Sequence, residues 1–142
     1  MIVKTVTLPC SPARAFALFT QHASEWWPPE RRHTGEATST IAMLESGRFF
    51  ERASDGREVE LGRVLVWRPD EELVLDWFPG TDADHPTRVV VTFTATDEQT
   101  RITIEHGPTP ASEELYPARA PRYAASWDLV LAALDRYALE HR

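Results

Sequence analysis

The stretch TRVVVTFTATDEQTRITIEH, residues 87–106, decides the fold class because its apolar side chains recur at every second position, as in two β-strands. Residues 97–99, Asp-Glu-Gln, separate the two halves with turn-forming side chains. A shift of one residue would exchange core for solvent, so the apolar set must face inward. The side chains predicted to face the core are Val89, Val91, Phe93, Ile102, Ile104 and His106.

Short runs of strand-forming residues continue on both sides of this hairpin. Turn sequences such as Glu-Ser-Gly at 45–47 and Ser-Asp-Gly at 54–56 separate them. Since no helical pattern interrupts residues 40–106, the runs predict an antiparallel meander and an α+β fold. The predicted strands are residues 2–8, 40–44, 48–53, 59–67, 73–77, 87–96 and 100–106.

Helical patterns lie only near the two ends of the chain. Ser11 followed by Pro12 is typical of a helix N-terminus, and the apolar stripe after it predicts a helix ending near Thr20. Pro28 and Pro29 then break the helical turn that contains two tryptophans. The last helix is expected from Arg122 onward, with its apolar face against the sheet. That face holds Trp127, Val130, Leu131, Leu134, Tyr137 and Ala138.

Length and composition restrict the class of protein. The 142 residues are enough for one domain, at about 150 residues per domain, and we treat 1–142 as a single domain. A net charge of -7 argues against nucleic acid and anionic membranes as partners. Cys10 is the only cysteine, and the histidines lack metal-ligand spacing, so we expect no disulfide, metal or cofactor. The start lacks the apolar core of a signal peptide, which predicts a cytoplasmic protein.

Large side chains are placed on the inward face. The strand ending at Trp77 puts that ring on the core side, and Trp127 is expected to face the sheet from the last helix. Five tryptophans, six phenylalanines and three tyrosines could fill the space between a curved sheet and one helix, or line a pocket for an apolar ligand. The sequence leaves both alternatives open.

Several local strings occur in a familiar order: SPARAFALFT, EWWP, SGRFFERASDG, GRVLVW, LDW and TRITIEHGP, followed by a last helix that contains tryptophan. Over nearly the whole chain this order resembles the START-like, SRPBCC helix-grip superfamily, in particular bacterial homologues of the activator of heat-shock-protein ATPase. The resemblance implies a helix-grip fold: seven antiparallel strands curved around the long C-terminal helix, two short helices after the first strand, and a cavity between sheet and helix. Superfamily members include binders of lipids and other apolar molecules, polyketide cyclases and chaperone co-factors linked to the stress response, so the fold leaves the function open.

The leading functional hypothesis is non-catalytic binding of a small apolar or aromatic molecule in this cavity. It depends on the ring-rich inward faces and on the resemblance. The candidate ligand contacts, chosen for size and expected position, are Trp26, Trp27, Phe50, Trp67, Trp77, Phe93, His106, Tyr123 and Trp127.

Two alternatives remain. The resemblance implies a protein-interaction module that activates a chaperone ATPase, with a chaperone or a second copy of the chain as partner. The other is a cyclase-like or hydrolytic enzyme in which His106 and Glu51 share acid and base duties, although a hydrogen-bonded strand-end histidine and a solvated or salt-bridged glutamate are the simpler readings. The face on which Glu51 lies is ambiguous, because Phe49 and Phe50 are both apolar. The charged run at 30–33 predicts a solvated loop.

Overall fold

Seven strands form one antiparallel sheet in the computed structural model, which describes all 142 residues. The sheet order is β1-β7-β6-β5-β4-β3-β2, so only the β1 and β7 pair joins strands distant in sequence. The predicted α+β fold is confirmed, and each predicted strand ends within two residues of an observed one. The strands are β1 (Ile2–Leu8), β2 (Thr40–Met43), β3 (Arg48–Arg52), β4 (Glu58–Arg68), β5 (Glu72–Trp77), β6 (Thr87–Thr96) and β7 (Gln99–Pro108).

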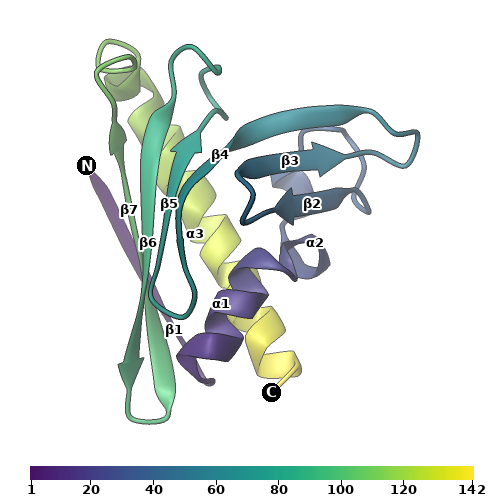
Figure 1. The fold of residues 1–142 in the computed structure, drawn as a ribbon, viewed down its shortest axis with the longest axis vertical. Helices are drawn as coiled ribbons and strands as arrows, with labels where there is room; N and C mark the ends of the chain where they lie inside the picture. The colour runs from purple at the N-terminus through teal and green to yellow at the C-terminus, as the bar shows by residue number, and fades with distance from the viewer.

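Two short helices follow β1, and a long one ends the chain. The Ser11 hydroxyl accepts a hydrogen bond from the Arg14 N–H at 3.2 Å, which caps the first helix as predicted. The long C-terminal helix crosses one face of the sheet (Figure 1). No helix is long and apolar enough to cross a bilayer. The helices are α1 (Pro12–Thr20), α2 (Ala23–Trp26), the 3-10 turn η1 (Pro29–Arg31) and α3 (Tyr116–Glu140).

Helix α3 begins six residues before the predicted start at Arg122. The prediction was wrong because prolines at 117 and 121 were taken to break the helix. Pro117 lies in the first turn, where its nitrogen would have no helical partner in any case. Pro121 is exposed and removes only one hydrogen bond from a 25-residue helix. The extra turns bring residues 116–121 over the sheet.

The sheet bends sharply at β4. Register shifts between Phe49 and Phe50 in the β3–β4 pairing, and between Val64 and Val66 in the β4–β5 pairing, mark bulges that curve a strand. Gly62 lies at this bend, where a Cβ atom would overlap the Asp76 carbonyl oxygen. As a result, β2 and β3 lie crosswise to β6 and β7 (Figure 1). The bend gives the sheet the concave face that holds α3.

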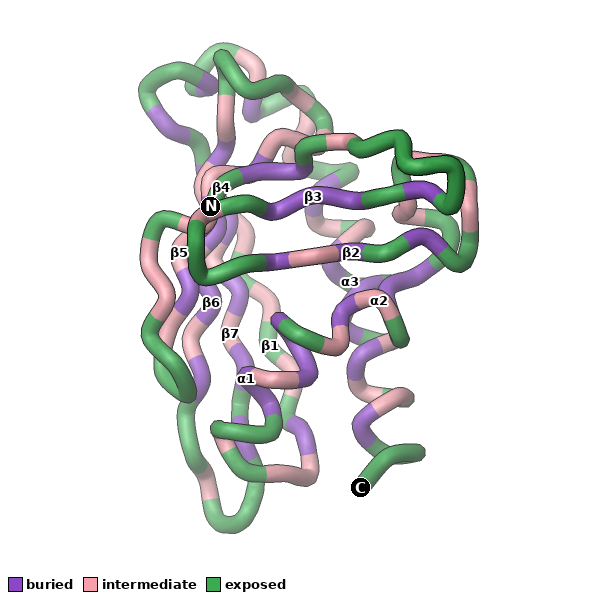
Figure 2. Tube along the Cα trace, turned by 45° about the vertical axis from the view of Figure 1, so that its right-hand side comes forward, coloured by how far each residue is buried: buried purple, intermediate pink, exposed green.

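The core lies between this concave face and the helices. Figure 2 shows buried positions alternating with more exposed ones along β6 and β7, which is the period of two predicted from the sequence. All six side chains predicted to face inward from residues 87–106 are buried. Trp77 and Trp127 are buried as well, and their ring centroids are 5.1 Å apart across the interface.

Candidate functional site

A cavity of about 620 Å³ lies between the first half of α3 and strands β3, β4 and β5. The η1 segment and the turn after β5 form its sides. A water molecule occupies about 30 Å³, so this volume is far above that of a few waters. The lining residues are Trp27, Glu30, Arg31, Arg32, His33, Phe49, Leu61, Trp77, Pro79, Gly80, Ala118, Arg119, Arg122, Tyr123, Ser126, Trp127 and Val130.

Five of these residues, Trp27, Phe49, Trp77, Tyr123 and Trp127, carry large rings and are called the cavity rings below. Trp77 is central: its ring centroid lies 6.4 Å from that of Trp27, 5.3 Å from Phe49 and 5.1 Å from Trp127. All three pairs are tilted by 37–39°, so the rings form a curved wall. The Trp77 indole N–H donates to no residue of the chain, whereas those of Trp27 and Trp127 donate to the Arg31 carbonyl and to His106.

The turn after β5 is clamped to α3. The Tyr123 hydroxyl donates to the Pro79 carbonyl at 2.8 Å, and Arg119 Nε donates to the Gly80 carbonyl at 2.8 Å. Gly80 has φ of 84°, and a Cβ atom there would lie 2.6 Å from the Tyr123 hydroxyl oxygen. A side chain at this position would therefore push the turn off the helix and open the cavity wall.

The opposite side of the cavity is the segment around η1. Arg31 Nε donates to the Ser126 hydroxyl on α3 at 2.8 Å. Arg32 is half-buried and donates to the main-chain carbonyls of Ser39 at 2.6 Å, Ser24 at 2.7 Å and Trp27 at 3.0 Å. The prediction of a solvated loop at 30–33 was therefore wrong for Arg31 and Arg32, which form a hydrogen-bonded cavity wall, whereas Glu30 and His33 are exposed.

Glu51 binds the main chain of the segment that follows η1. The side chain is fully buried, and its carboxylate accepts hydrogen bonds from the main-chain N–H of His33 at 2.7 Å and of Thr34 at 2.9 Å. The hydroxyls of Thr34 and Ser39 donate to it at 2.6 and 2.9 Å. Burial by itself raises the pKa of the Glu51 carboxyl, but these hydrogen bonds outweigh it and the net pKa is lowered. Glu51 is thus an ionised structural group, which corrects the expectation of a solvated or salt-bridged glutamate.

His106 is buried behind the cavity rings and does not line the cavity. The Trp127 indole N–H donates to its Nδ1 at 3.0 Å, so the imidazole proton is on Nε2, which donates to the Thr87 hydroxyl oxygen at 2.8 Å. Burial lowers the pKa of His106 to about 4. The ring is therefore neutral at pH 7, and both of its nitrogens are hydrogen-bonded. This agrees with the simpler interpretation given from the sequence, a hydrogen-bonded histidine at the end of a strand.

The structure does not bring His106 and Glu51 together. Strands β6, β5 and β4 lie between β7, which carries His106, and β3, which carries Glu51. Each side chain is fully hydrogen-bonded to other partners, and neither lines the cavity. The acid and base pair that the enzyme hypothesis requires is absent, so that assignment was wrong.

Four of the nine predicted ligand contacts line the cavity: Trp27, Trp77, Tyr123 and Trp127. Trp26, Trp67, Phe93 and His106 pack elsewhere in the core and do not line it. For Trp67, Phe93 and His106 the placement at the cavity was wrong because strand parity indicates the face of the sheet but not the position along the helix. Trp26, at the end of α2, packs against Phe19 instead.

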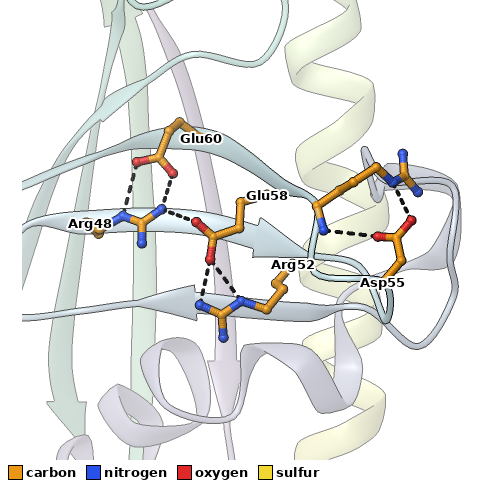
Figure 3. A network of polar contacts seen from close by, with 6 residues as sticks. Arg48, Arg52, Asp55, Glu58 and Glu60 are labelled. Atoms are coloured by element: carbon orange, nitrogen blue, oxygen red, sulfur yellow. Dashed lines mark hydrogen bonds and ion pairs between the residues drawn. The ribbon is translucent and has the colours of Figure 1, made fainter.

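Phe50 lies on the outer face of the sheet, so its placement in the cavity was also wrong. The Arg48 and Arg52 guanidinium carbons lie 3.8 and 5.1 Å from its ring centroid and cover it. Figure 3 shows how these two arginines form ion pairs with Glu58 and Glu60 on the neighbouring strand. A ring buried by arginines looks like a core residue in the sequence.

The sequence analysis missed the arginines at the mouth of the cavity. Arg119 and Arg122 are three residues apart on α3 and therefore project on the same side of the helix as Tyr123 and Ser126. That spacing was the available signal, but Arg119 lies before the predicted start of the helix at Arg122. No group of three or more His, Cys, Asp or Glu side chains is placed to hold a metal ion.

A curved antiparallel sheet that grips one long helix and leaves a cavity beside it defines the START-like helix-grip class. The chain belongs to the family of Activator of Hsp90 ATPase homolog 1-like proteins, whose model matches residues 9–138. The resemblance stated from the sequence is confirmed. No curated protein sequence matches the chain significantly.

Solved structures with the same fold come from several bacteria. The self-sacrificing resistance protein CalC from Micromonospora echinospora is 24% identical, with a TM-score of 0.77 over 99% of this chain and 94% of CalC. Protein Ms6760 from Mycobacterium smegmatis is 18% identical, with a TM-score of 0.65 over 99% and 91% of the two chains. Protein NE0264 from Nitrosomonas europaea is 12% identical, with a TM-score of 0.67 over 99% and 94%. At these identities the likeness concerns the fold alone.

Proposed function

We propose that the chain binds a small aromatic molecule in the cavity between α3 and strands β3, β4 and β5. The observation that carries this proposal is a space of about 620 Å³ walled by five large rings. Ligand pockets in proteins measure about 300–1,000 Å³ and are mostly apolar with a few polar groups. Here the polar groups are the Trp77 indole N–H and the side chains at the mouth.

Flat rings favour an aromatic ligand over a flexible chain. A planar molecule offers large contact area without losing many rotatable bonds, and it can take the tilted arrangement that the cavity rings adopt among themselves. The tethered walls support this, because the turn after β5 and the η1 segment are both bonded to α3 before any ligand enters. A preformed site avoids the cost of ordering loops on binding.

The test uses N-phenylnaphthylamine, a neutral aromatic dye whose fluorescence rises in apolar surroundings. We expect saturable one-to-one binding with a dissociation constant on the order of 10 μM. Ala118→Trp places a ring in the mouth and should abolish binding. Ala125→Trp adds the same ring to an exposed position of α3 outside the cavity and should leave binding unchanged. Equal binding by both variants would show that the dye binds elsewhere and would refute the proposal.

The family match supports a second candidate, a protein-interaction module that stimulates a chaperone ATPase. It would be favoured by stoichiometric recovery of a chaperone on the immobilised chain together with stimulation of that chaperone's ATP hydrolysis. Recovery without stimulation would argue against it. The Ala118→Trp variant separates the two functions, because it blocks the cavity: stimulation of ATP hydrolysis that survives this substitution would not depend on the cavity.

A further inference from the structure

We propose that the ligand is an aromatic anion whose acidic group is held at the mouth of the cavity by Arg31, Arg119 and Arg122. This inference rests on the proposed function, since it concerns the same cavity. It names the chemical class of the ligand: a ring system that carries a carboxylate, sulfonate or phosphate.

The charge at the mouth is opposite to that of the molecule. The chain has 15 Lys and Arg against 22 Asp and Glu, for a net charge of -7. Yet the cavity lining contains four arginines and only one carboxylate, that of Glu30. Like charges gathered in a partly desolvated site repel one another unless an anion is placed among them. A ligand with an acidic group would remove this cost.

The mouth arginines, Arg31, Arg119 and Arg122, form no ion pair within the chain, a property that they share with Arg14, Arg63, Arg101, Arg136 and Arg142. On the outer surface Arg48, Arg52, Arg57, Arg68 and Arg88 all form ion pairs with Asp or Glu. Arg31 and Arg119 donate from Nε to neutral oxygens, the Ser126 hydroxyl and the Gly80 carbonyl. Arg122 is exposed and has no protein partner.

These neutral contacts orient the guanidinium groups. Arg31 Nη1 also donates to the Glu30 carbonyl at 3.1 Å, and the remaining terminal N–H groups are free. Arg119 and Arg122 project from one side of α3, three residues apart. Arg31 faces them from η1, because Ser126, to which it is bonded, lies one helical turn beyond Arg122. Free donors thus reach the mouth from two elements, which is the arrangement that binds a planar or tetrahedral oxyanion.

Arg32 is the exception among the four. Its N–H groups are used by the carbonyls of Ser24, Trp27 and Ser39, so it builds the wall and has little left for a ligand. Glu30 at the same mouth would repel an anion. Glu30→Gln removes this repulsion and should strengthen anion binding about two- to threefold, as expected for an exposed charge.

The test compares two dyes with the same ring framework, anilinonaphthalene sulfonate and neutral N-phenylnaphthylamine. We expect the sulfonate to bind about tenfold more tightly, the equivalent of one charge-assisted hydrogen bond. Arg122→Gln should lose that preference and leave the affinity for the neutral dye unchanged. The double variant Arg119→Gln with Arg122→Gln should also lose the preference, and it should bind the neutral dye more weakly because Arg119 holds the turn after β5. Arg101→Gln, an exposed arginine on β7, is the matched control. Added salt should weaken binding of the sulfonate only.

The outcomes separate this inference from the proposed function. If both dyes bind in the cavity with equal affinity and the arginine variants change neither, the cavity binds aromatic molecules and the anion inference is overturned. If neither dye binds, or Ala118→Trp affects neither, the proposed function fails and the inference with it. A preference for the sulfonate that disappears in Arg122→Gln but persists in Arg101→Gln supports both.

Discussion

The two ends of the interface between α3 and the sheet contain similar rings but are built differently. At one end Phe16, Phe19, Trp26, Trp67 and Phe93, called the packed rings here, fill the space. The Phe16 centroid lies 5.2 Å from those of both Trp67 and Phe93. At the other end the cavity rings are as well buried, yet they enclose about 620 Å³.

The difference lies in what covers the sheet. Helix α1 inserts Phe16 and Phe19 over β6, so no space is left there. Between α3 and strands β3, β4 and β5 there is no second helix (Figure 1). The bend at Gly62 also directs these strands away from the rest of the sheet. The η1 segment closes only the side and contributes charged groups. Ring content therefore does not indicate a cavity; the number of elements that share the concave face does.

The largest expected effect is a difference in stability loss between a substitution in the packed rings and one in the cavity rings. Phe19→Ala should lower the free energy of unfolding by about 3–5 kcal/mol, because its fully buried ring leaves a void that the packed rings cannot close. The affinity for N-phenylnaphthylamine should not change. Trp27→Ala should cost less stability, since its ring already borders a void, and should weaken dye binding about tenfold.

Urea unfolding and dye titration of both variants measure this contrast. If Phe19→Ala weakened dye binding as much as Trp27→Ala, the two ends of the interface would not be separate regions.

The next effect concerns His106, which is buried behind the cavity rings with its ring centroid 4.3 Å from that of Tyr123. Its pKa is lowered from 6.5 to about 4 in the folded state. Between these values the unfolded chain binds more protons, so stability decreases as the pH falls, by about 3 kcal/mol when pH 4 is reached. His106→Gln should lack this component of the pH dependence.

Urea unfolding from pH 7 to pH 4 tests this, with His33→Gln, an exposed histidine whose ring forms no ion pair, as the control. Acidic groups titrate similarly in all three proteins, so the difference between the curves isolates His106. Identical curves for the wild type and His106→Gln would mean that water from the cavity reaches the imidazole.

A smaller effect is expected at Glu51, which binds the segment beside the mouth of the cavity. Glu51→Gln places an amide against the main-chain N–H groups of His33 and Thr34, which then lose a charged acceptor. We expect a loss of about 1–3 kcal/mol in the free energy of unfolding, together with weaker dye binding, because the segment that carries Arg31 is released. Unchanged stability in urea would show that the carboxylate does not hold this segment.

Periodic features were predictable from the sequence, and local exceptions were not. The faces of β5, β6 and β7 followed from alternation because each has one apolar set. At β3 the side chains still alternate between the two faces, but their polarity does not follow the faces. Phe49 and Glu51 face inward, while Phe50 faces outward and is covered by two arginines. Glu51 was ambiguous for this reason, and its partners at 33–39 are too distant in sequence for a pattern to reveal them.

The candidate site was predictable only in part. Trp77 was expected on the core side of its strand and Trp127 on the sheet side of the last helix, and both placements are confirmed. The separation of cavity rings from packed rings depends on the bulges in β4, which leave no signature in hydrophobic period. The pairing of Arg119 with Arg122 on one side of the helix became recognisable only when α3 was found to include residues 116–121.

The five indole N–H groups offer the most direct test, because they report on both regions in one proton–nitrogen NMR spectrum. On titration with N-phenylnaphthylamine, the account predicts that the signals of Trp27, Trp77 and Trp127 shift, whereas that of Trp67 among the packed rings stays in place. A bound dye that shifts Trp67 and leaves Trp77 and Trp127 unchanged would contradict the assignment of the cavity as the binding site.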